Sequence, residues 1–145
     1  MNEEFVTKSI IYYLKSNGWN IFSFDYPQSG TGYLIHPNSR FHKNKEAVIP
    51  DIIANKDSKC IIMENKSYFY ADDFIKLDEL SNSEIYTNDL ENLTARLGCE
   101  KIFYGIGLPN TVEIANKDQD IINLVDFIIT VDKSKNCKYF SLKKY

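Results

Sequence analysis

At 145 residues, with 43% hydrophobic and 26% charged residues, the chain is long enough to bury a hydrophobic core without a metal or a disulfide. One domain spanning residues 1–145 is therefore expected. The net charge of −3 excludes a protein that holds nucleic acid by bulk positive charge, so a nucleic-acid partner would need a local basic patch.

The N-terminal segment and the cysteines indicate a cytoplasmic protein. Residues 1–19 carry acidic side chains where a signal peptide needs positive charge, and no apolar run approaches the ~20 residues of a membrane span. Cys60, Cys99 and Cys137 are widely spaced and form no metal-binding pattern. They are expected to be reduced thiols, with Cys60 filling a strand.

The first part of the chain predicts one helix followed by three strands. Apolar residues recur at helical spacing until Asn17 and Gly18, which supply a stop. The expected elements are a helix over 3–16, a strand over 19–26, a long polar loop over 27–46 with a short strand near 33–35, and a hairpin of strands over 49–54 and 60–63.

The remainder predicts helices, a strand and a second hairpin. The expected elements are helices over 71–80 and 88–97, a strand over 101–108, and a hairpin of strands over 124–132 and 138–144. The aromatic segment 67–74 favours core packing and a helix start over a base-stacking platform, although Tyr68 and Tyr70 share the parity of Lys66 if the strand continues. The fold class is therefore α/β, with an antiparallel meander at the centre of a mixed sheet.

The first hairpin brings charged residues together. If Asn55 pairs with Cys60, antiparallel pairing sets Asp51 opposite Glu64, and period-two alternation puts Lys66 on the same face. Like charges directly opposite each other are destabilising, and Mg²⁺, which prefers oxygen ligands, would relieve their repulsion. The alternative is that these residues are exposed charges at strand ends.

The same residues resemble a known signature. Pro50-Asp51, twelve further residues and then Glu64-Asn65-Lys66 have the form of the PD-(D/E)xK nuclease superfamily. The core of that superfamily, a helix, three antiparallel strands, a helix and a strand, is similar to the predicted order over roughly residues 3–107. The resemblance implies a restriction endonuclease-like core, followed here by a C-terminal β-hairpin.

The resemblance also implies roles for individual residues. Asp51 and Glu64 would bind Mg²⁺, for which Mn²⁺ is expected to substitute, together with the backbone carbonyl of Asn65. Lys66 would position or activate the attacking water. A further acidic ligand is expected from the first helix, with Glu4 as the first candidate and Glu3 as the second; the alternative is that both only favour the positive N-terminus of the helix.

Contacts to DNA are expected from the long loop before the Pro-Asp element. Its polar and basic side chains lie where phosphates would approach, although a merely solvated loop is the competing interpretation. The candidates are Gln28, Ser29, Thr31, Arg40, His42, Lys43 and Lys45.

The first functional hypothesis is an Mg²⁺-dependent DNA endonuclease, with type II restriction endonucleases as the expected class and double-stranded DNA as the partner. One site cuts one strand, so duplex cleavage by a short chain indicates a homodimer. The alternatives are a structure-specific nuclease that resembles Holliday junction resolvases, a defence or repair nuclease, and a non-catalytic nucleic-acid-binding module that keeps the fold.

Overall fold

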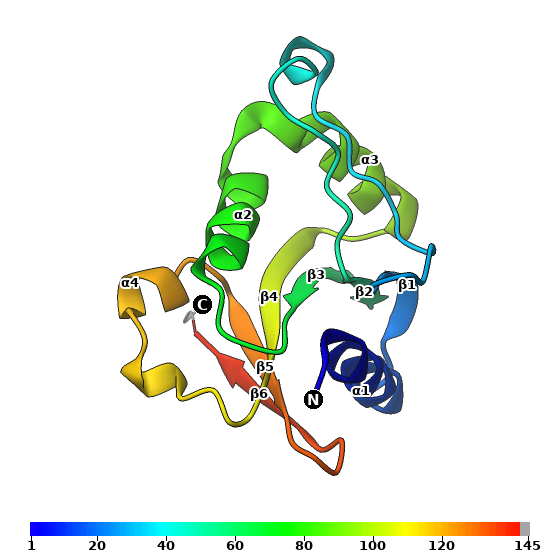
Figure 1. Ribbon diagram of the computed structural model, residues 1–145. Coiled ribbons are helices and arrows are strands. Elements are labelled where there is room, and N and C mark those ends of the chain that lie inside the picture. Colours follow the sequence, from blue (N-terminus) through cyan, green and yellow to red (C-terminus); the bar gives the residue numbers. More distant parts are fainter. Residues whose placement is uncertain (143–145) are drawn as a thin grey trace.

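The computed structural model describes residues 1–142, which form one mixed six-stranded sheet with helices on both faces (Figure 1). The α/β class expected from the sequence is confirmed. The strands, in their order across the sheet, are β1 (Asn20–Phe24), β2 (Ile52–Lys56), β3 (Lys59–Asn65), β4 (Lys101–Pro109), β5 (Phe127–Val131) and β6 (Cys137–Ser141). The α-helices are α1 (Glu3–Ser16), α2 (Ala71–Asn82), α3 (Thr87–Leu97) and α4 (Gln119–Ile122).

Helix α1 has the predicted bounds, and local hydrogen bonds explain both ends. The side chain of Asn2 accepts a hydrogen bond from the Phe5 amide at 2.8 Å, which satisfies one of the free amides of the first turn. At the other end Gly18 has φ +85°, a conformation that glycine adopts without a steric penalty. The chain then turns directly into β1.

The β2–β3 hairpin has the register predicted from the sequence. Ile53 pairs with Ile62 and Asn55 with Cys60. The ladder continues further toward the turn than expected, to a pair between Lys56 and Lys59, so that only two residues form the turn. The N-terminal end of β2 and the C-terminal end of β3 therefore meet at the same edge of the sheet.

The first three strands are antiparallel, and the chain then crosses over to a parallel pair. Helices α2 and α3 connect β3 to β4, which run parallel, and β5 is parallel to β4. Strand β6 returns antiparallel to β5 and forms the predicted C-terminal hairpin. Residues 143 and 144, which the prediction placed in this last strand, lie outside the described residues.

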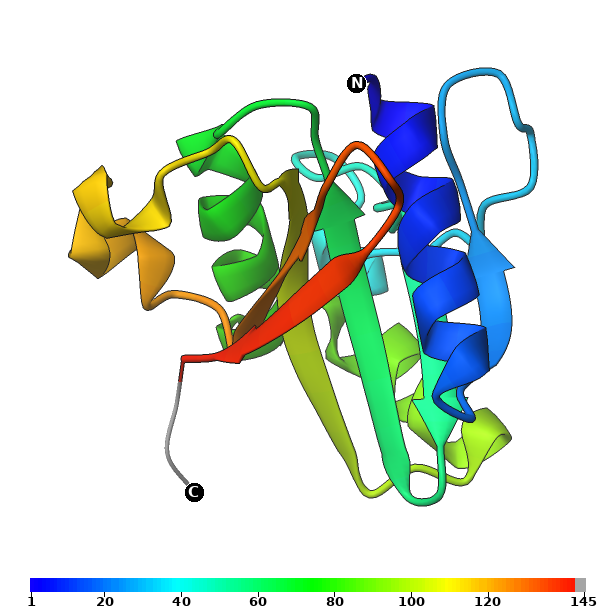
Figure 2. The same ribbon diagram turned by 90° about the horizontal axis from the view of Figure 1, so that it is seen from below.

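Helix α1 covers one face of the sheet and helices α2 and α3 cover the other (Figures 1 and 2). A hydrophobic core lies on each face. On one face, Ile10 of α1 and Met63 of β3 belong to a cluster that also contains Phe127. On the other face, Ile62 of β3 packs in a cluster with Leu77 of α2. Alternate residues of β3 thus point toward different helices, which decides where the polar residues at its end are directed.

Two predictions for the connecting segments differ from the structure. The segment near residues 33–35 forms only an isolated bridge between Ile35 and Val48 rather than a strand. Between β4 and β5, where no element was predicted, the chain forms the one-turn helix α4 and buries Ile122.

None of the helices within residues 1–142 combines the length and apolar character needed to cross a membrane.

The prediction of reduced thiols is wrong for Cys60 and Cys99, whereas Cys137 is a free thiol and Cys60 fills β3 as predicted. Cys60 and Cys99 form a disulfide, with their Cα atoms 5.9 Å apart, inside the range that a disulfide spans. The parallel pairing of β3 with β4 begins at Lys59 and Lys101, and it brings the residue after the α3 cap beside the start of β3. Only the tertiary fold creates this proximity, because the two cysteines are 39 residues apart in sequence.

Reduction of this disulfide is expected to destabilise the protein. Opening a loop of this length lowers the free energy of unfolding by about 2–4 kcal/mol, because the unfolded chain regains conformational entropy. The melting temperature should fall in dithiothreitol and in Cys99→Ser, whereas Cys137→Ser should respond to reductant like the wild type. Three reactive thiols in the air-oxidised protein, with unchanged melting in reductant, would contradict the assignment.

Candidate active site

Asp51 and Glu64 come together where β2 begins and β3 ends. The amide of Asp51 donates a hydrogen bond to the Met63 carbonyl at 3.0 Å, and the amide of Asn65 donates to Oδ2 of Asp51 at 2.7 Å. Both acidic residues are buried, with 7% of Asp51 and 5% of Glu64 exposed. The carboxyl pair expected from the hairpin register therefore exists, and it is enclosed rather than displayed at a strand end.

Burial raises the pKa of both carboxyl groups. For Asp51, loss of solvent and next the charge of Glu64 raise the pKa to about 9. For Glu64, loss of solvent also raises the pKa, although Lys76 opposes the shift. Two carboxylates in one dry site repel each other, so without a cation the pair retains a proton near neutral pH.

Lys76 of α2 is the ammonium nearest to the pair, and it was not predicted. Its Nζ lies 3.0 Å from Oε1 of Glu64, although this oxygen makes no hydrogen bond of good geometry. Burial alone would lower the pKa of Lys76, but the adjoining Glu64 carboxylate outweighs it and the pKa is raised. Lys76 thus stays charged, and it partly neutralises the site from the side of α2.

Asp73, one turn before Lys76, is a second polar residue that the sequence analysis missed. Only 6% of it is exposed, and burial followed by the charge of Glu64 raises its pKa to about 6. It shares the buried stripe of α2 with Leu77 and Leu80. An acid in an otherwise apolar helical stripe is a sequence signal that could have identified it.

Lys66 lies at the rim of the site with its side chain 26% exposed, and its Nζ is 4.0 Å from Oε1 of Glu3. Burial by itself lowers the pKa of Lys66, but the acidic side chains of Asp73 and then Glu3 reverse this and raise it. Lys66 is therefore an ammonium at neutral pH. It can orient a water molecule or stabilise negative charge, and it is not a base in this state.

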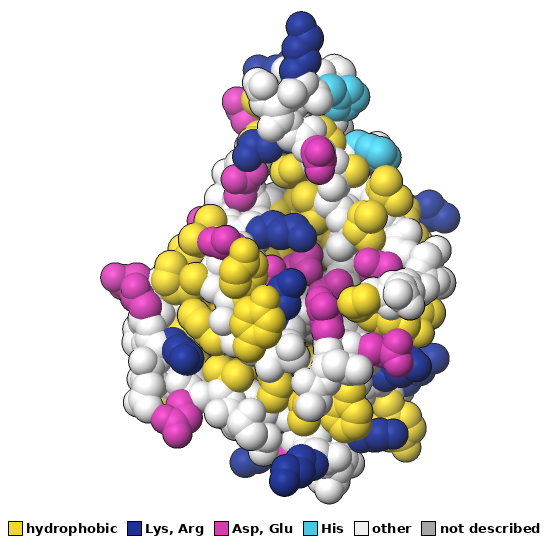
Figure 3. Space-filling view, in the orientation of Figure 1, with side chains coloured by type: hydrophobic (Ala, Val, Ile, Leu, Met, Phe, Trp, Pro, Cys, Tyr) yellow, Lys and Arg dark blue, Asp and Glu magenta, His cyan; other side chains and the backbone are white. Residues whose placement is uncertain are grey.

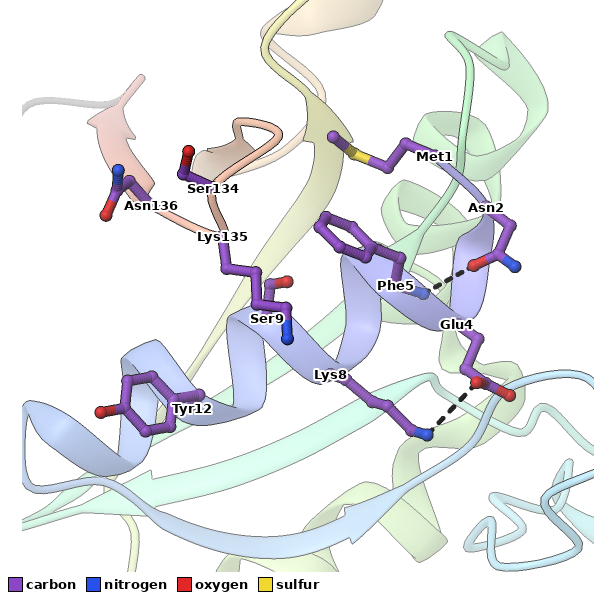
Figure 4. A pocket seen from close by; sticks show the side chains of 10 residues that line it. All are labelled: Met1, Asn2, Glu4, Phe5, Lys8, Ser9, Tyr12, Ser134, Lys135 and Asn136. Carbon is purple, nitrogen blue, oxygen red and sulfur yellow. Dashed lines mark hydrogen bonds and ion pairs between the residues drawn. The ribbon is translucent and has the colours of Figure 1, made fainter.

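The structure favours Glu3 over Glu4 as the acidic residue of α1 at this site. Glu3 contacts Lys66, whereas Glu4 forms an ion pair with Lys8 at 3.2 Å on the outer side of the helix (Figure 4). That side borders a cavity of about 900 Å³ between α1 and the β5–β6 turn. Glu4 thus faces a different surface from the carboxyl pair, and Glu3 is the one of the two candidates that lies beside Lys66, while metal binding by either remains a prediction.

Two of the residues predicted to contact DNA from the first half of the loop, Ser29 and Thr31, form hydrogen bonds with neighbouring parts of the chain. Oγ of Ser29 donates to the Asp25 carboxylate at 2.9 Å, and Oγ1 of Thr31 donates to the Phe24 carbonyl at 2.7 Å. Gln28 has φ +69°, which marks the tight turn at the start of the loop. The Ser29 and Thr31 side chains stabilise the loop conformation, the Gln28 side chain is exposed, and contact of all three with DNA remains a prediction.

The basic residues of the second half lie on a projection above α2 and α3 (Figures 1 and 3). Arg40 forms an ion pair with Glu84 at 2.7 Å, and Lys45 forms one with Glu79 at 2.9 Å. The ring of His42 contacts the Pro37 carbonyl at 2.8 Å, and Lys43 is exposed. None of these side chains forms a hydrogen bond or ion pair with Asp51 or Glu64 within residues 1–142, although Glu79, the partner of Lys45, lies one turn after Lys76 on α2.

Within residues 1–142, no three His, Cys, Asp or Glu side chains converge closely enough to hold a metal ion by themselves. The donor set still suits Mg²⁺, which is bound in many sites by one or two carboxylates while it keeps several waters. Asp51 and Glu64 would supply those oxygens, and a cation would replace the proton that the buried pair retains. The Asn65 carbonyl, next along β3, is the third predicted ligand.

Comparison with known proteins assigns no family to the chain, because neither a family model nor a curated protein matches it. The site is therefore interpreted from its own geometry and from the signature described above.

The pKa of Asp51 predicts a pH-dependent gain in stability for Asp51→Asn in EDTA. The ordinary pKa is 3.8 and the folded value about 9, so between them the folded state holds a proton that the unfolded chain releases. Wild-type stability from this group is thus lost as the pH rises through that window. The variant keeps an acceptor for the Asn65 amide, and its advantage should grow by about 4 kcal/mol between about pH 5 and about pH 8.

Urea unfolding at the two pH values measures this difference. Asp57→Asn is the matched control, because Asp57 is exposed in the β2–β3 turn. An equal stability difference between wild type and Asp51→Asn at both pH values would show that Asp51 is not protonated in the folded protein.

Proposed function

We propose that the chain is a divalent-metal-dependent nuclease that hydrolyses phosphodiester bonds of DNA at the Asp51–Glu64 site. One observation carries the proposal: the two acids of the Pro-Asp and Glu-x-Lys elements are buried side by side, and Lys66 stands at their rim. A purely structural hairpin gains nothing from two adjoining buried carboxyl groups, since each costs free energy when it ionises.

The order of the elements supports a restriction endonuclease-like core. Helix α1, the antiparallel strands β1 to β3, helices α2 and α3, and the parallel strand β4 follow one another as in the superfamily that the signature resembles. The strand pairing brings both halves of the signature to one edge of the sheet.

Each residue of the site would have a different role in hydrolysis. Asp51 and Glu64 would hold Mg²⁺ with the Asn65 carbonyl, and the hydrogen bond from the Asn65 amide fixes the orientation of the Asp51 carboxylate. When bound there, Mg²⁺ supplies positive charge to the phosphate and lowers the pKa of a bound water. The Lys66 ammonium is placed to orient that water or to stabilise charge on the phosphate as it develops.

Lys76 gives the site a second fixed positive charge. Its ion pair with Glu64 positions that carboxylate from the α2 side and offsets part of the repulsion within the pair. With a cation bound, the same ammonium could turn to a phosphate oxygen, because its side chain is 43% exposed.

Two nuclease classes remain open under this proposal. A type II restriction endonuclease would cut a duplex as a homodimer, and a structure-specific nuclease would cut at junctions, flaps or ends. A non-catalytic module is disfavoured, because a chain without catalysis would have no need of Asp51, Glu64 and Lys66 together. The homodimer and the cytoplasmic location remain predictions.

Cleavage of defined DNA substrates tests the proposal. Supercoiled plasmid, phage DNA, a four-way junction and a flapped duplex, with RNA as a further substrate, are incubated with Mg²⁺, Mn²⁺ or EDTA. We expect metal-dependent cleavage that falls at least about 100-fold in Asp51→Asn and Lys66→Ala, because charge stabilisation at the phosphate is lost. Discrete plasmid fragments would indicate a restriction enzyme.

The neighbouring acids of α1 provide an internal control. Glu3→Gln should alter the metal dependence, since Glu3 contacts Lys66, whereas Glu4→Gln should cleave like the wild type because Glu4 pairs with Lys8 elsewhere. If wild type and Asp51→Asn were equally inert on every substrate with either metal, the nuclease proposal would fail.

A further inference from the structure

Two tyrosines that follow β3 lie exposed immediately beside the carboxyl site. Tyr68 is 55% exposed and Tyr70 is 41% exposed, in contrast to the core packing expected for this segment. Their rings meet edge to face with centroids 6.0 Å apart. Two large aromatic rings on the surface leave apolar area in water that a partner could cover.

The residue between them explains why they point outward. Phe69 packs inward against Phe74 of α2, with ring centroids 5.3 Å apart, and so anchors the segment to the core. The chain bends at Tyr68 and is extended at Tyr70, and both tyrosine side chains are exposed while Phe69 is packed against the core. The pair is therefore held on a fixed backbone that leads directly into α2.

The tyrosine pair is continuous with the candidate active site. Nζ of Lys66 lies 5.5 Å from the centroid of the Tyr70 ring. If a phosphate contacts the Lys66 ammonium, the base of the same nucleotide can therefore reach the Tyr70 ring. Figure 3 shows hydrophobic side chains directly beside the acidic and basic side chains at the centre of this face.

The charge around the pair fits a nucleobase better than a phosphate. Asp72 is exposed, and its hydrogen bond with the Tyr70 hydroxyl is the main cause of a raised pKa of that tyrosine. A carboxylate here would repel a phosphate, whereas it can accept hydrogen bonds from the amino groups of bases. The aromatic faces suit bases of any type, because every base presents a π-face.

We propose that Tyr68 and Tyr70 form a stacking platform for unpaired nucleobases next to the scissile phosphate. Bases inside a duplex are already stacked on each other and cannot reach such a platform, so the preferred substrate carries unpaired nucleotides at the cleavage point. This inference rests on the proposed nuclease function, and among its two classes it selects the structure-specific one.

Binding by a non-cleaving protein tests the platform separately from catalysis. In the Asp51→Asn background, fluorescence anisotropy measures affinity for a blunt duplex, the same duplex with a single-stranded flap, and the single strand alone. The flap and the single strand should bind about 10-fold more tightly than the blunt duplex. A 2-aminopurine in the first unpaired nucleotide should lose fluorescence as it stacks.

Substitutions separate stacking from general apolar contact. Tyr68→Leu and Tyr70→Leu should each weaken flap binding about fivefold or more and restore the 2-aminopurine signal, while blunt-duplex affinity changes less than about twofold. Tyr68→Phe and Tyr70→Phe keep the ring and should bind like the parent. Tyr12→Leu is the matched control, because Tyr12 is 73% exposed on the far side of α1.

Three results would overturn the platform. These are equal affinity for flap and duplex in the parent, an equal loss for both substrates in the leucine variants, or a change of oligomeric state in those variants, which would identify the tyrosines as a protein contact. None of these results depends on cleavage. If the protein cuts DNA with metal but the leucine variants bind flaps like the parent, the platform is refuted and the nuclease proposal stands.

Discussion

The burial of two carboxyl groups against each other, Asp51 and Glu64, is the constraint on which the rest of the site depends. Removing both from water and placing them together costs free energy in the ionised state, and the raised pKa values express that cost. Both carboxyl groups are buried where β2 begins and β3 ends. Adjoining buried carboxyl groups that lower stability are a feature expected of functional sites, where proteins give up stability for function.

The fold concentrates charge around the pair from several elements. Helix α1 contributes one acid, the two strand ends contribute two acids and a lysine, and α2 contributes an acid and a lysine. The charged groups that influence one another there are Glu3, Asp51, Glu64, Lys66, Asp73 and Lys76. Four acids against two lysines would leave two net negative charges if all were ionised. Bound protons or one divalent cation can balance that excess.

The sequence predicted the parts of the site that depend on local pattern. The bounds of α1 followed from helical periodicity with the stop at Asn17 and Gly18, and the β2–β3 register followed from two apolar runs around a short turn. The hairpin register alone sufficed to predict that Asp51 lies beside Glu64. The alternation of β3 also placed Lys66 correctly at the rim of the pair.

The remaining features arise from tertiary packing that no local pattern encodes. Lys76 reaches Glu64 only because α2 crosses the sheet at that point, and the Cys60–Cys99 disulfide exists only because β3 and β4 pair in parallel. The basic loop residues were expected near the site because they precede Pro50 in sequence. In the structure Lys45 pairs instead with Glu79 of α2, and Arg40 pairs with Glu84 in the short turn between α2 and α3.

Divalent-cation binding tests most directly whether the carboxyl pair is a metal site. Titration of Mn²⁺ by calorimetry in buffers of different ionisation enthalpy gives both the number of ions bound and the number of protons released. The account predicts one ion per chain with release of about one proton, because the cation replaces the proton shared by Asp51 and Glu64. Binding should be lost in Asp51→Asn and retained in Glu4→Gln. Equal binding by wild type and Asp51→Asn, or binding without proton release, would contradict it.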